Sequence, residues 1–269
     1  MSINGKLSTN PLQGRRVLVT RAAEQAAAFT EQLRQRGAQV VECPTISLVG
    51  PESWESIDQA LKNLASFDWL ILTSVNGVRF FFGRMQELGS VIHDLQNCMV
   101  CAVGPKTAEA VQELGITPDL VPEQFTGEGV VKAFERINLQ GKQVLFPKAD
   151  GARDLIPQQL RARGAVVVDP VVYRNIIPSD LPETARLALA QQQLDAVVFS
   201  SPSTMRNLSV LLGGMNRLEE VLQGVTVASI GPVTTKACRE LGLTVTVEPD
   251  QATLDDLLQA LVEHFSKKP

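Results

Sequence analysis

Residues that could hold an anionic ligand recur directly after short apolar runs in this sequence. They are mostly hydroxyls, glycines and cations, at Thr20, Arg21, Ser74, Asn76, Gly104, Thr107, Lys148, Ser200, Ser201, Ser203, Gly231, Thr234 and Thr235. Hydroxyl groups and the free N–H groups of helix N-termini bind carboxylates without requiring a net positive protein. The pattern therefore predicts a site for a ligand that carries several carboxylates.

Some of these residues have an equally good structural interpretation. Pro105 and Pro232 follow the two glycines at the expected first position of a helix, where a missing N–H costs nothing. Arg21 and Lys148 could pair with ligand carboxylates, or could cap a helix or bridge to a nearby acid. The residues alone leave both interpretations open.

Tyr173 is the only tyrosine in the chain, and it follows the apolar run AVVVDPVV. Its ring is therefore expected to be packed, with the hydroxyl at one edge. A phenol in that position could donate a proton to a substrate. The alternative is a strand aromatic whose hydroxyl only meets a backbone carbonyl.

The sequence gives little support for other common types of catalytic or metal-binding site. Cys98 and Cys101 have CxxC spacing, but they open an expected strand and no second pair exists, which favours packing over metal binding. The only histidines, His93 and His264, stand at no strand end, which argues against triad catalysis and a histidine metal site. No GxxxxGK[ST], GxSxG or GxGxxG motif is present.

These residues belong to an internal duplication. At an offset of 127 residues the sequence matches itself without insertion from about Gly14 to Phe134, for example Gly37 with Gly164. Further pairs are Arg21 with Lys148, Asp68 with Asp195, Ser74 with Ser201, Gly104 with Gly231, Thr107 with Thr234 and Thr126 with Thr253. Tyr173 has Ile46 as its counterpart, so the duplication supplies one phenol and not two.

The elements that must position these residues alternate between strands and helices. Short Val/Ile/Leu-rich runs such as VLVT, WLILTS and MVCAVG are separated by helical segments, for example 24–36, 105–115 and 232–241. Continuously apolar strands indicate parallel sheets that are covered on both faces. We therefore expect an α/β protein with two similar doubly wound domains.

The composition of the chain argues against nucleic acids and membranes as partners. The chain of 269 residues has a formal charge of −4 and no Lys/Arg stripe, which argues against a nucleic acid partner. No apolar stretch approaches the roughly 20 residues of a membrane helix, and the first residues lack a signal-peptide core. With four irregularly spaced cysteines and no disulfide framework, a cytoplasmic protein is expected.

Taken in order, the motifs resemble those of the uroporphyrinogen III synthase family over roughly residues 14–265. The motifs that carry this likeness are VLVTR (17–21), LTSVNGVRFFF (72–82), AVGPKTAEAVQELG (102–115), FTGEGVV (125–131), VVYR (171–174), FSSPST (199–204) and SIGPVTTKACRELG (229–242). One departure is Val233, where family members often carry a further threonine, a role that Thr235 could take.

The resemblance implies a fold of two α/β domains joined by a two-stranded connector. One domain would combine residues 1–46 and 175–269, and the other would span 50–170. The connectors would lie near 43–49 and 169–175. The sequence alone does not show whether each domain combines segments of both repeats in this way or whether the two repeats form two simple tandem domains.

The resemblance also implies a reaction. The family closes hydroxymethylbilane to uroporphyrinogen III by loss of water, through a spiro intermediate that inverts ring D. It uses no metal and no organic cofactor, and a monomer is expected. By position, Tyr173 would be the proton donor, and the strand-end residues named above would hold substrate carboxylates.

Two alternatives from other functional classes remain at this point. A noncatalytic two-domain module that binds anions, like a periplasmic solute receptor, would show similar helix termini, although the absence of a signal peptide argues against it. A regulatory or scaffold protein would use the same residues only to cap helices, and no ligand would stabilise it.

Overall fold

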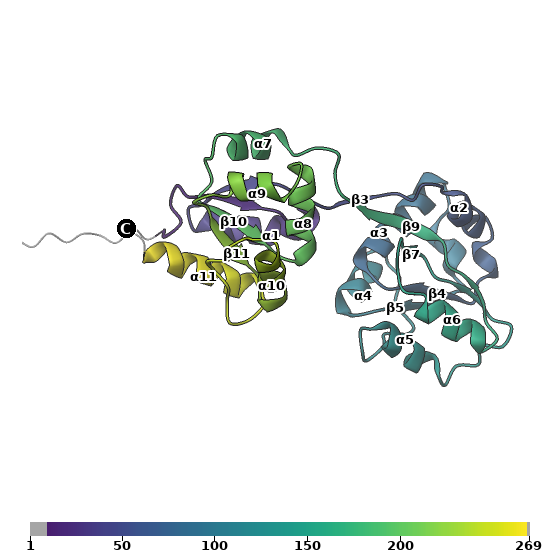
Figure 1. The fold of residues 1–269 in the computed structure, drawn as a ribbon. Helices are drawn as coiled ribbons and strands as arrows, with labels where there is room; N and C mark the ends of the chain where they lie inside the picture. Colours follow the sequence, from purple (N-terminus) through teal and green to yellow (C-terminus); the bar gives the residue numbers. More distant parts are fainter. Residues whose placement is uncertain (1–9, 268–269) are drawn as a thin grey trace, which may run out of the picture. The chain divides into compact units, whose positions relative to one another are not determined.

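The computed structural model of the protein describes residues 10–267. Contacts between residues divide the chain into two compact units (Figure 1). The discontinuous unit comprises the described residues up to Ser47 and from Ile176 onward, and the continuous unit is Leu48–Asn175. The chain thus passes from one unit to the other at two places.

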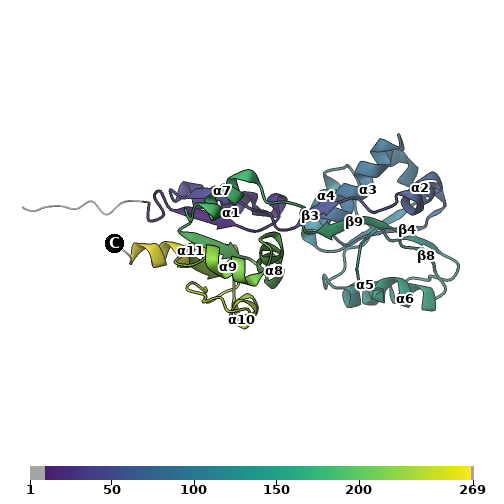
Figure 2. The same ribbon diagram turned by 45° about the horizontal axis from the view of Figure 1, so that its top comes forward.

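The continuous unit is built on a parallel sheet with the strand order β5-β4-β6-β8. Its strands are β4 (Trp69–Leu72), β5 (Met99–Ala102), β6 (Gln143–Leu145) and β8 (Val166–Val168). Its helices are α2 (Glu55–Lys62), η1 (Leu64–Ser66), α3 (Val75–Glu87), η2 (Ile92–Leu95), α4 (Pro105–Gln112), α5 (Gly127–Phe134) and α6 (Leu155–Ala162). In Figure 2 the strands lie between α2, α3 and α4 on one side and α5 and α6 on the other.

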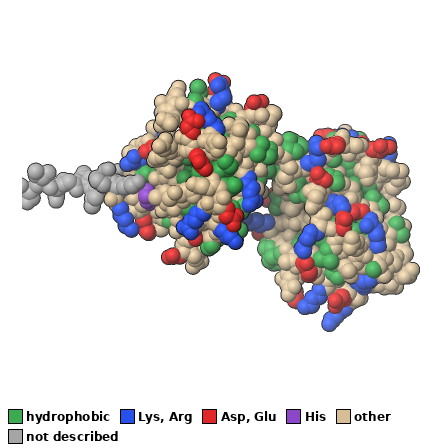
Figure 3. All heavy atoms as spheres, viewed as in Figure 1, with side chains coloured by type: hydrophobic (Ala, Val, Ile, Leu, Met, Phe, Trp, Pro, Cys, Tyr) green, Lys and Arg blue, Asp and Glu red, His purple; other side chains and the backbone are tan. Residues whose placement is uncertain are grey.

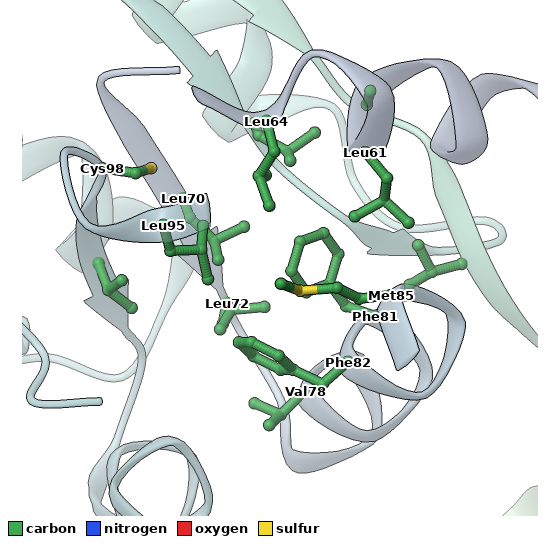
Figure 4. Packing of buried hydrophobic residues seen from close by; sticks show 14 of the residues in the cluster. Leu61, Leu64, Leu70, Leu72, Val78, Phe81, Phe82, Met85, Leu95 and Cys98 are labelled. Atoms are coloured by element: carbon green, nitrogen blue, oxygen red, sulfur yellow. The ribbon is translucent and has the colours of Figure 1, made fainter. Parts of the chain in front are cut away.

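Alternate residues of the buried strand β4 supply the two cores of this sheet. Leu70 and Leu72 pack with α2, α3 and α4, whereas Trp69 and Ile71 pack with α5 and α6. Because strand side chains alternate between faces, a strand covered on both sides must be apolar throughout. Figure 4 shows the first core, where Phe81 of α3 gathers with Leu70 and Leu72.

The discontinuous unit repeats this design with the strand order β11-β10-β1-β2, again parallel. Its strands are β1 (Arg16–Val19), β2 (Gln39–Glu42), β10 (Ala196–Phe199) and β11 (Thr226–Ser229). Its helices are α1 (Ala23–Gln35), α7 (Glu183–Ala190), α8 (Pro202–Leu211), α9 (Met215–Val221), α10 (Pro232–Glu240) and α11 (Leu254–Ser266). Helices α1 and α11 cover one face of the sheet, and α7, α8, α9 and α10 cover the other.

Each strand of one sheet has its counterpart 127 residues away in the other sheet. The strand pair β4 and β5 corresponds to β10 and β11, and β6 and β8 correspond to β1 and β2. The registers also correspond, since Trp69 opposes Met99 and Ala196 opposes Thr226. Each sheet therefore contains two strands from the first sequence copy and two from the second.

The predicted class is confirmed: both units are α/β with parallel sheets. The predicted strands and helices appear with ends shifted by only a few residues. Glycines that were expected to end helices have positive φ, for example +87° at both Gly37 and Gly164. A residue without a side chain adopts this conformation at little cost, which is why helices stop there.

A small sheet with the order β3-β9-β7 completes the fold. It consists of β3 (Ser47–Val49), β9 (Val171–Ile176) and β7 (Lys148–Ala149). Strands β3 and β9 are the two segments at which the chain passes between its units, and β7 adds a third strand to this pair. Tyr173 lies on β9.

The exposed surface carries charges of both signs. On the face displayed in Figure 3, Lys and Arg side chains lie interspersed with Asp and Glu, without a stripe of one sign. Many are paired with each other, for example Arg34 with Glu42 and Arg153 with Glu128. Among the described helices, none combines the length and the apolar composition needed to cross a membrane.

Candidate functional site

The strand order of each sheet identifies where a ligand should bind. From β4 the chain moves outward to β5 and then returns to the other side of β4 at β6. In open α/β sheets, ligands bind beyond the carboxyl ends of the strands where such a reversal occurs. For the continuous unit, that place is just after β4 and β6.

A cavity of about 170 Å³ opens at these strand ends. Its walls include Thr73 after β4, Val103 after β5 and Phe146 after β6. The other walls come from the α5 region and from the segment that leads into α6, namely Phe125, Thr126, Gly127, Val130, Ala152, Arg153, Leu155 and Ile156. Two hydroxyls, a helix start and one guanidinium thus lie among mostly apolar walls at the place that the strand order identifies.

Ser74 and Tyr173 meet at the same edge of the continuous unit. Their hydroxyl oxygens are 3.3 Å apart, and either can be the donor. Ser74 is the N-cap of α3, and its Oγ accepts a hydrogen bond from the Gly77 N–H at 3.0 Å. The hydroxyl of the buried Tyr173 therefore lies beside a helix N-terminus. Its hydrogen-bond partner is the Ser74 side chain, whereas a purely structural tyrosine was expected to bond to a backbone carbonyl.

Phe80 is a neighbour of Tyr173 that the sequence analysis did not single out. The two rings are stacked with centroids 5.5 Å apart and an interplanar angle of 18°. The guanidinium of Arg79 lies 5.0 Å from the Phe80 ring centre. The only signal was the aromatic run after Gly77 in the LTSVNGVRFFF motif, which is equally typical of a core helix.

Lys148 lies among acids. Its Nζ donates to Asp154 at 2.8 Å and to Asp169 at 2.7 Å. Burial alone would lower the pKa of Lys148, but hydrogen bonds to these carboxylates outweigh it and raise the pKa. The lysine therefore stays charged and acts as a bridge to nearby acids, one of the two roles expected for it. Its contact with substrate stays a prediction.

Gly104 and Thr107 lie on either side of the start of α4. Gly104 is buried with φ +87°, and a Cβ added there would meet the Phe125 ring at 3.4 Å. Thr107, the third helical residue, is only 4% exposed and faces the core side of the helix. Asn76, in the first turn of α3, is half-buried.

In the discontinuous unit, Thr20 lies at the junction of β1 and β10. It is fully buried, and its Oγ1 donates to the Val198 carbonyl at 2.7 Å. Its own carbonyl accepts from Thr45 Oγ1 at 3.0 Å. Arg21 is half-buried, and its Nε donates to the Gln25 carbonyl in the first turn of α1 at 3.1 Å.

The serines after β10 form a local hydrogen-bonded group. Ser201 is the N-cap of α8, and its Oγ accepts from the Thr204 N–H at 3.3 Å. The hydroxyls of Ser201 and Ser203 are 2.8 Å apart. Ser203 is exposed and Ser200 is half-buried, so this group of hydroxyls can be reached from solvent.

The second Gly-Pro helix start is more crowded than the first. Gly231 has extended backbone, and a Cβ added there would lie 2.9 Å from the Ala252 Cβ. Thr234 and Thr235 are each 2% exposed, and the Thr235 hydroxyl is hydrogen-bonded to that of Ser229. Val233, at the position where relatives were expected to carry threonine, is 75% exposed.

Most of the predicted residues share at least one of three features: a contact with another predicted residue, access to solvent, or burial. Ser74 and Tyr173 are in contact, and Ser201 and Ser203 are in contact. Residues with solvent access at strand ends are Arg21, Asn76, Ser200 and Ser203. Residues that face the interior are Thr20, Thr107, Thr234 and Thr235; the Thr20 hydroxyl bonds to the Val198 carbonyl and the Thr235 hydroxyl to that of Ser229.

The CxxC pair lies on opposite faces of the sheet. Cys98 packs with Leu95 and Leu70, whereas Cys101 packs with Phe134 and other residues beneath α5. Burial raises the pKa of each thiol to about 12. The expected packing role of both residues agrees with these positions. Within residues 10–267, no three His, Cys, Asp or Glu side chains come together as a metal-binding group.

Comparisons with known proteins point to one family. A family model described as uroporphyrinogen-III synthase HemD matches residues 27–259. The chain is 38% identical to a uroporphyrinogen-III synthase of Synechococcus elongatus, over 95% of this chain and 97% of the relative. It is 30% identical to a uroporphyrinogen-III synthase of Chlorobaculum parvum, over 92% of this chain and 98% of the relative.

The fold has solved counterparts as well. The crystal structure of a mutant uroporphyrinogen III synthase from Thermus thermophilus covers 95% of this chain and 100% of its own. The TM-score is 0.56 at 22% sequence identity. This structural likeness shows that the two chains share a fold.

Proposed function

The chain belongs to the uroporphyrinogen-III synthase family, whose members are cyclising lyases of tetrapyrrole synthesis, and we propose that its Tyr173 supplies the proton for the loss of water. The substrate is hydroxymethylbilane, a linear tetrapyrrole, and the product is uroporphyrinogen III, in which ring D is inverted. The leaving group is the hydroxyl of the hydroxymethyl substituent.

One observation carries the assignment of Tyr173. Its hydroxyl is 3.3 Å from Ser74 Oγ, at the N-terminus of α3 and beside the strand ends where a ligand is expected. A general acid must lie within hydrogen-bond reach of the group that it protonates. Among the described residues no other phenol exists, because Tyr173 is the only tyrosine of the whole sequence.

The proton balance of the reaction fits a single donor. Tyr173 gives its proton to the leaving hydroxyl, the carbon–oxygen bond breaks, and water departs. The carbon left behind forms a bond with the substituted α carbon of ring D to give the spiro intermediate. The original bond from that carbon to the methylene bridge of ring C then breaks, and the bridge carbon bonds to the free α carbon of ring D, which leaves ring D inverted. A proton is then lost from a pyrrole carbon, which restores the phenol, so no other reactant is consumed.

Positioning supplies much of the rate in this proposal. Holding reacting groups in one geometry can contribute as much as an acid or base does. The strand-end residues proposed to hold the substrate carboxylates, directly or through helix N–H groups, are Thr20, Arg21, Ser74, Asn76, Gly104, Thr107, Lys148, Ser200, Ser201, Ser203, Gly231, Thr234 and Thr235. Thr107, Thr234 and Thr235 are buried in the first turns of α4 and α10, which supports a role through the backbone N–H groups of these helix starts.

We further propose that the two compact units are the two domains of the enzyme, with β3 and β9 as the connectors. The reaction itself requires neither a metal nor an organic cofactor, because it transfers only a proton and water. We propose that the enzyme acts as a monomer in the cytoplasm.

The test is the isomer of the product. Freshly generated hydroxymethylbilane is supplied to the protein, the product is oxidised, and type I and type III uroporphyrin are separated by chromatography. Spontaneous closure yields type I, so a reaction without protein is the control. Dominant type III product is expected. Type I alone, with substrate still stabilising the protein, would instead indicate a module that only binds anions.

A further inference from the structure

The Ser74 hydroxyl has two partners at once. Its oxygen accepts from the Gly77 N–H at 3.0 Å and lies 3.3 Å from the Tyr173 oxygen. A serine hydroxyl offers one proton and two lone pairs. Since Gly77 uses a lone pair, Ser74 can donate its proton to the Tyr173 oxygen. This leaves the phenol proton available for a substrate oxygen.

The tyrosine is held from a second side by the same helix. Phe80, also on α3, stacks on the Tyr173 ring at 5.5 Å between centroids. The Tyr173 side chain is only 8% exposed, and its carbonyl accepts from the Asp150 N–H at 2.9 Å. Helix α3 therefore fixes both the plane of the ring and the partner of its hydroxyl.

Helix α3 presents its N-terminus at this place. The N-terminus of a helix carries a partial positive charge, and Gly77 supplies one of the first N–H groups of α3. As Tyr173 gives up its proton, negative charge grows on its oxygen. A hydrogen bond donated to a charged oxygen is roughly twice as strong as one between neutral groups.

We propose that Ser74 is a positioning residue that donates a hydrogen bond to the Tyr173 oxygen and thereby couples it to the N-terminus of α3 during proton transfer. This inference rests on the proposed function, in which Tyr173 is the proton donor. It assigns the Ser74 hydroxyl to Tyr173, so that any contact with a substrate carboxylate at this place is made through the backbone N–H groups of the helix start, which Ser74→Gly retains.

The discontinuous unit contains the same cap without a tyrosine beside it. Ser201, the counterpart of Ser74, accepts from the Thr204 N–H at 3.3 Å and so caps α8 in the same way. The counterpart of Tyr173 is Ile46, and the Ser201 hydroxyl lies near Ser203 instead. The cap is thus common to both copies, and its link to a phenol is specific to one.

The experiment separates the link from the cap. Ser74→Gly removes the hydroxyl but leaves a residue that is well tolerated as an N-cap, and Ser74→Thr keeps a hydroxyl. Both are made in the natural chain and in Tyr173→Phe. The control is Thr253→Gly, which removes a cap of the same kind at α11, where Thr253 Oγ1 accepts from the Asp256 N–H at 3.1 Å.

We expect Ser74→Gly to lower kcat for type III product roughly tenfold to a hundredfold with KM unchanged. Ser74→Thr recovers most of this loss. In the Tyr173→Phe background, Ser74→Gly causes no further loss, because the two changes remove one shared interaction. Thr253→Gly keeps the kcat of the natural chain, and thermal unfolding shows that both glycine variants fold.

Two results would assign Ser74 to the substrate: an equal loss of kcat from Ser74→Gly in both backgrounds, or a raised KM with kcat unchanged. Either would mean that Ser74 acts on the substrate and not through Tyr173. Full turnover in the Tyr173→Phe variant would show that Tyr173 is not the acid, and the proposed function of this residue would fail with it. A slow Tyr173→Phe together with a fast Ser74→Gly would refute only the role of Ser74.

Discussion

Asp68 and Asp195, at equivalent positions of the two sequence copies, make the same contacts in the two units. Asp195 accepts from the Arg15 guanidinium at 2.8 Å and from the Arg16 N–H at 2.8 Å. Asp68 accepts from Lys142 Nζ at 2.7 Å and from the Gln143 N–H at 2.8 Å. Each carboxylate thus ties the start of one central strand to the start of its neighbour.

We expect Asp68→Asn to lower the free energy of unfolding by about 1–2 kcal/mol at pH 7, because the ion pair with Lys142 is lost. The Lys142 hydrogen bond, followed by that of the Gln143 N–H, lowers the pKa of Asp68. Such an acid stabilises the fold above its unfolded pKa, near 4, and this contribution is lost as pH falls through the folded pKa.

The difference between Asp68→Asn and the natural chain should therefore shrink below about pH 4, as measured by urea unfolding across pH. The control is Glu42→Gln, which breaks the ion pair between half-exposed Arg34 and Glu42. It should change stability by less than about 1 kcal/mol. A pH-independent effect of Asp68→Asn would contradict the expectation.

Tyr173→Phe should lower kcat roughly a hundredfold or more with little change in KM, because the proton donor is absent while the ring remains. The stacking on Phe80 and the place of the residue in the core need no hydroxyl. Initial rates of type III formation measure the effect, and near-normal turnover would exclude Tyr173 as the acid.

Lys148→Met should affect stability more than substrate binding. Lys148 is 15% exposed and pairs with Asp169, which is 19% exposed and also pairs with Arg161 at 2.5 Å. The change removes one of the two cations beside this carboxylate, so a loss of about 1–2 kcal/mol in unfolding free energy is expected. A large rise in KM at unchanged stability would show that Lys148 acts on the substrate alone, without a structural role for its ion pairs. Arg153→Met, at an exposed pair, is the control for stability.

Gly104→Ala and Gly83→Ala should act in opposite directions. Gly104 has φ +87° and faces the Phe125 ring, so alanine there should cost about 1–2 kcal/mol. At Gly83, within α3, an added Cβ meets no atom within 4 Å, and alanine should stabilise the helix by about 0.5–1 kcal/mol. Chemical denaturation of both variants tests the pair, and equal signs would contradict it.

The cysteines should resist thiol reagents in the folded protein. Burial raises the pKa of Cys43, Cys98 and Cys101 to about 12 and that of Cys238 to about 11. The reactive thiolate is therefore scarce at about pH 8, and the sulfur is also shielded. Labelling should be slow under native conditions and fast in denaturant. Rapid native labelling would show that a core opens.

The class of fold was predictable because it depends on local patterns. Apolar runs of strand length, helix-ending glycines such as Gly37 and the offset of 127 residues all lie in the sequence itself. The partners of each strand were not predictable from such patterns. Since β1 and β6 have equivalent sequences, the apolar pattern allows β1 to pair with strands of either copy.

The candidate site was predictable only in part. Hydroxyls at strand ends can be read from the sequence, but which of them face inward depends on the rotation of each helix. Thr107 and Thr234 are therefore indistinguishable in sequence from exposed hydroxyls such as Ser203, yet both are buried. Phe80 was missed because an aromatic residue on a helix usually signals core, and only the structure brings it to Tyr173.

The pairing of β1 with β10 determines the order in which the protein can fold during its synthesis. Val17 opposes Ala196, so the sheet of the discontinuous unit cannot close until the ribosome has made most of the chain. The continuous unit holds all strands of its main sheet within residues 48–175 and can fold earlier. Domains generally fold as their own residues emerge. Strands β1 and β2, although made before the continuous unit, are thus among the last segments to reach their native places.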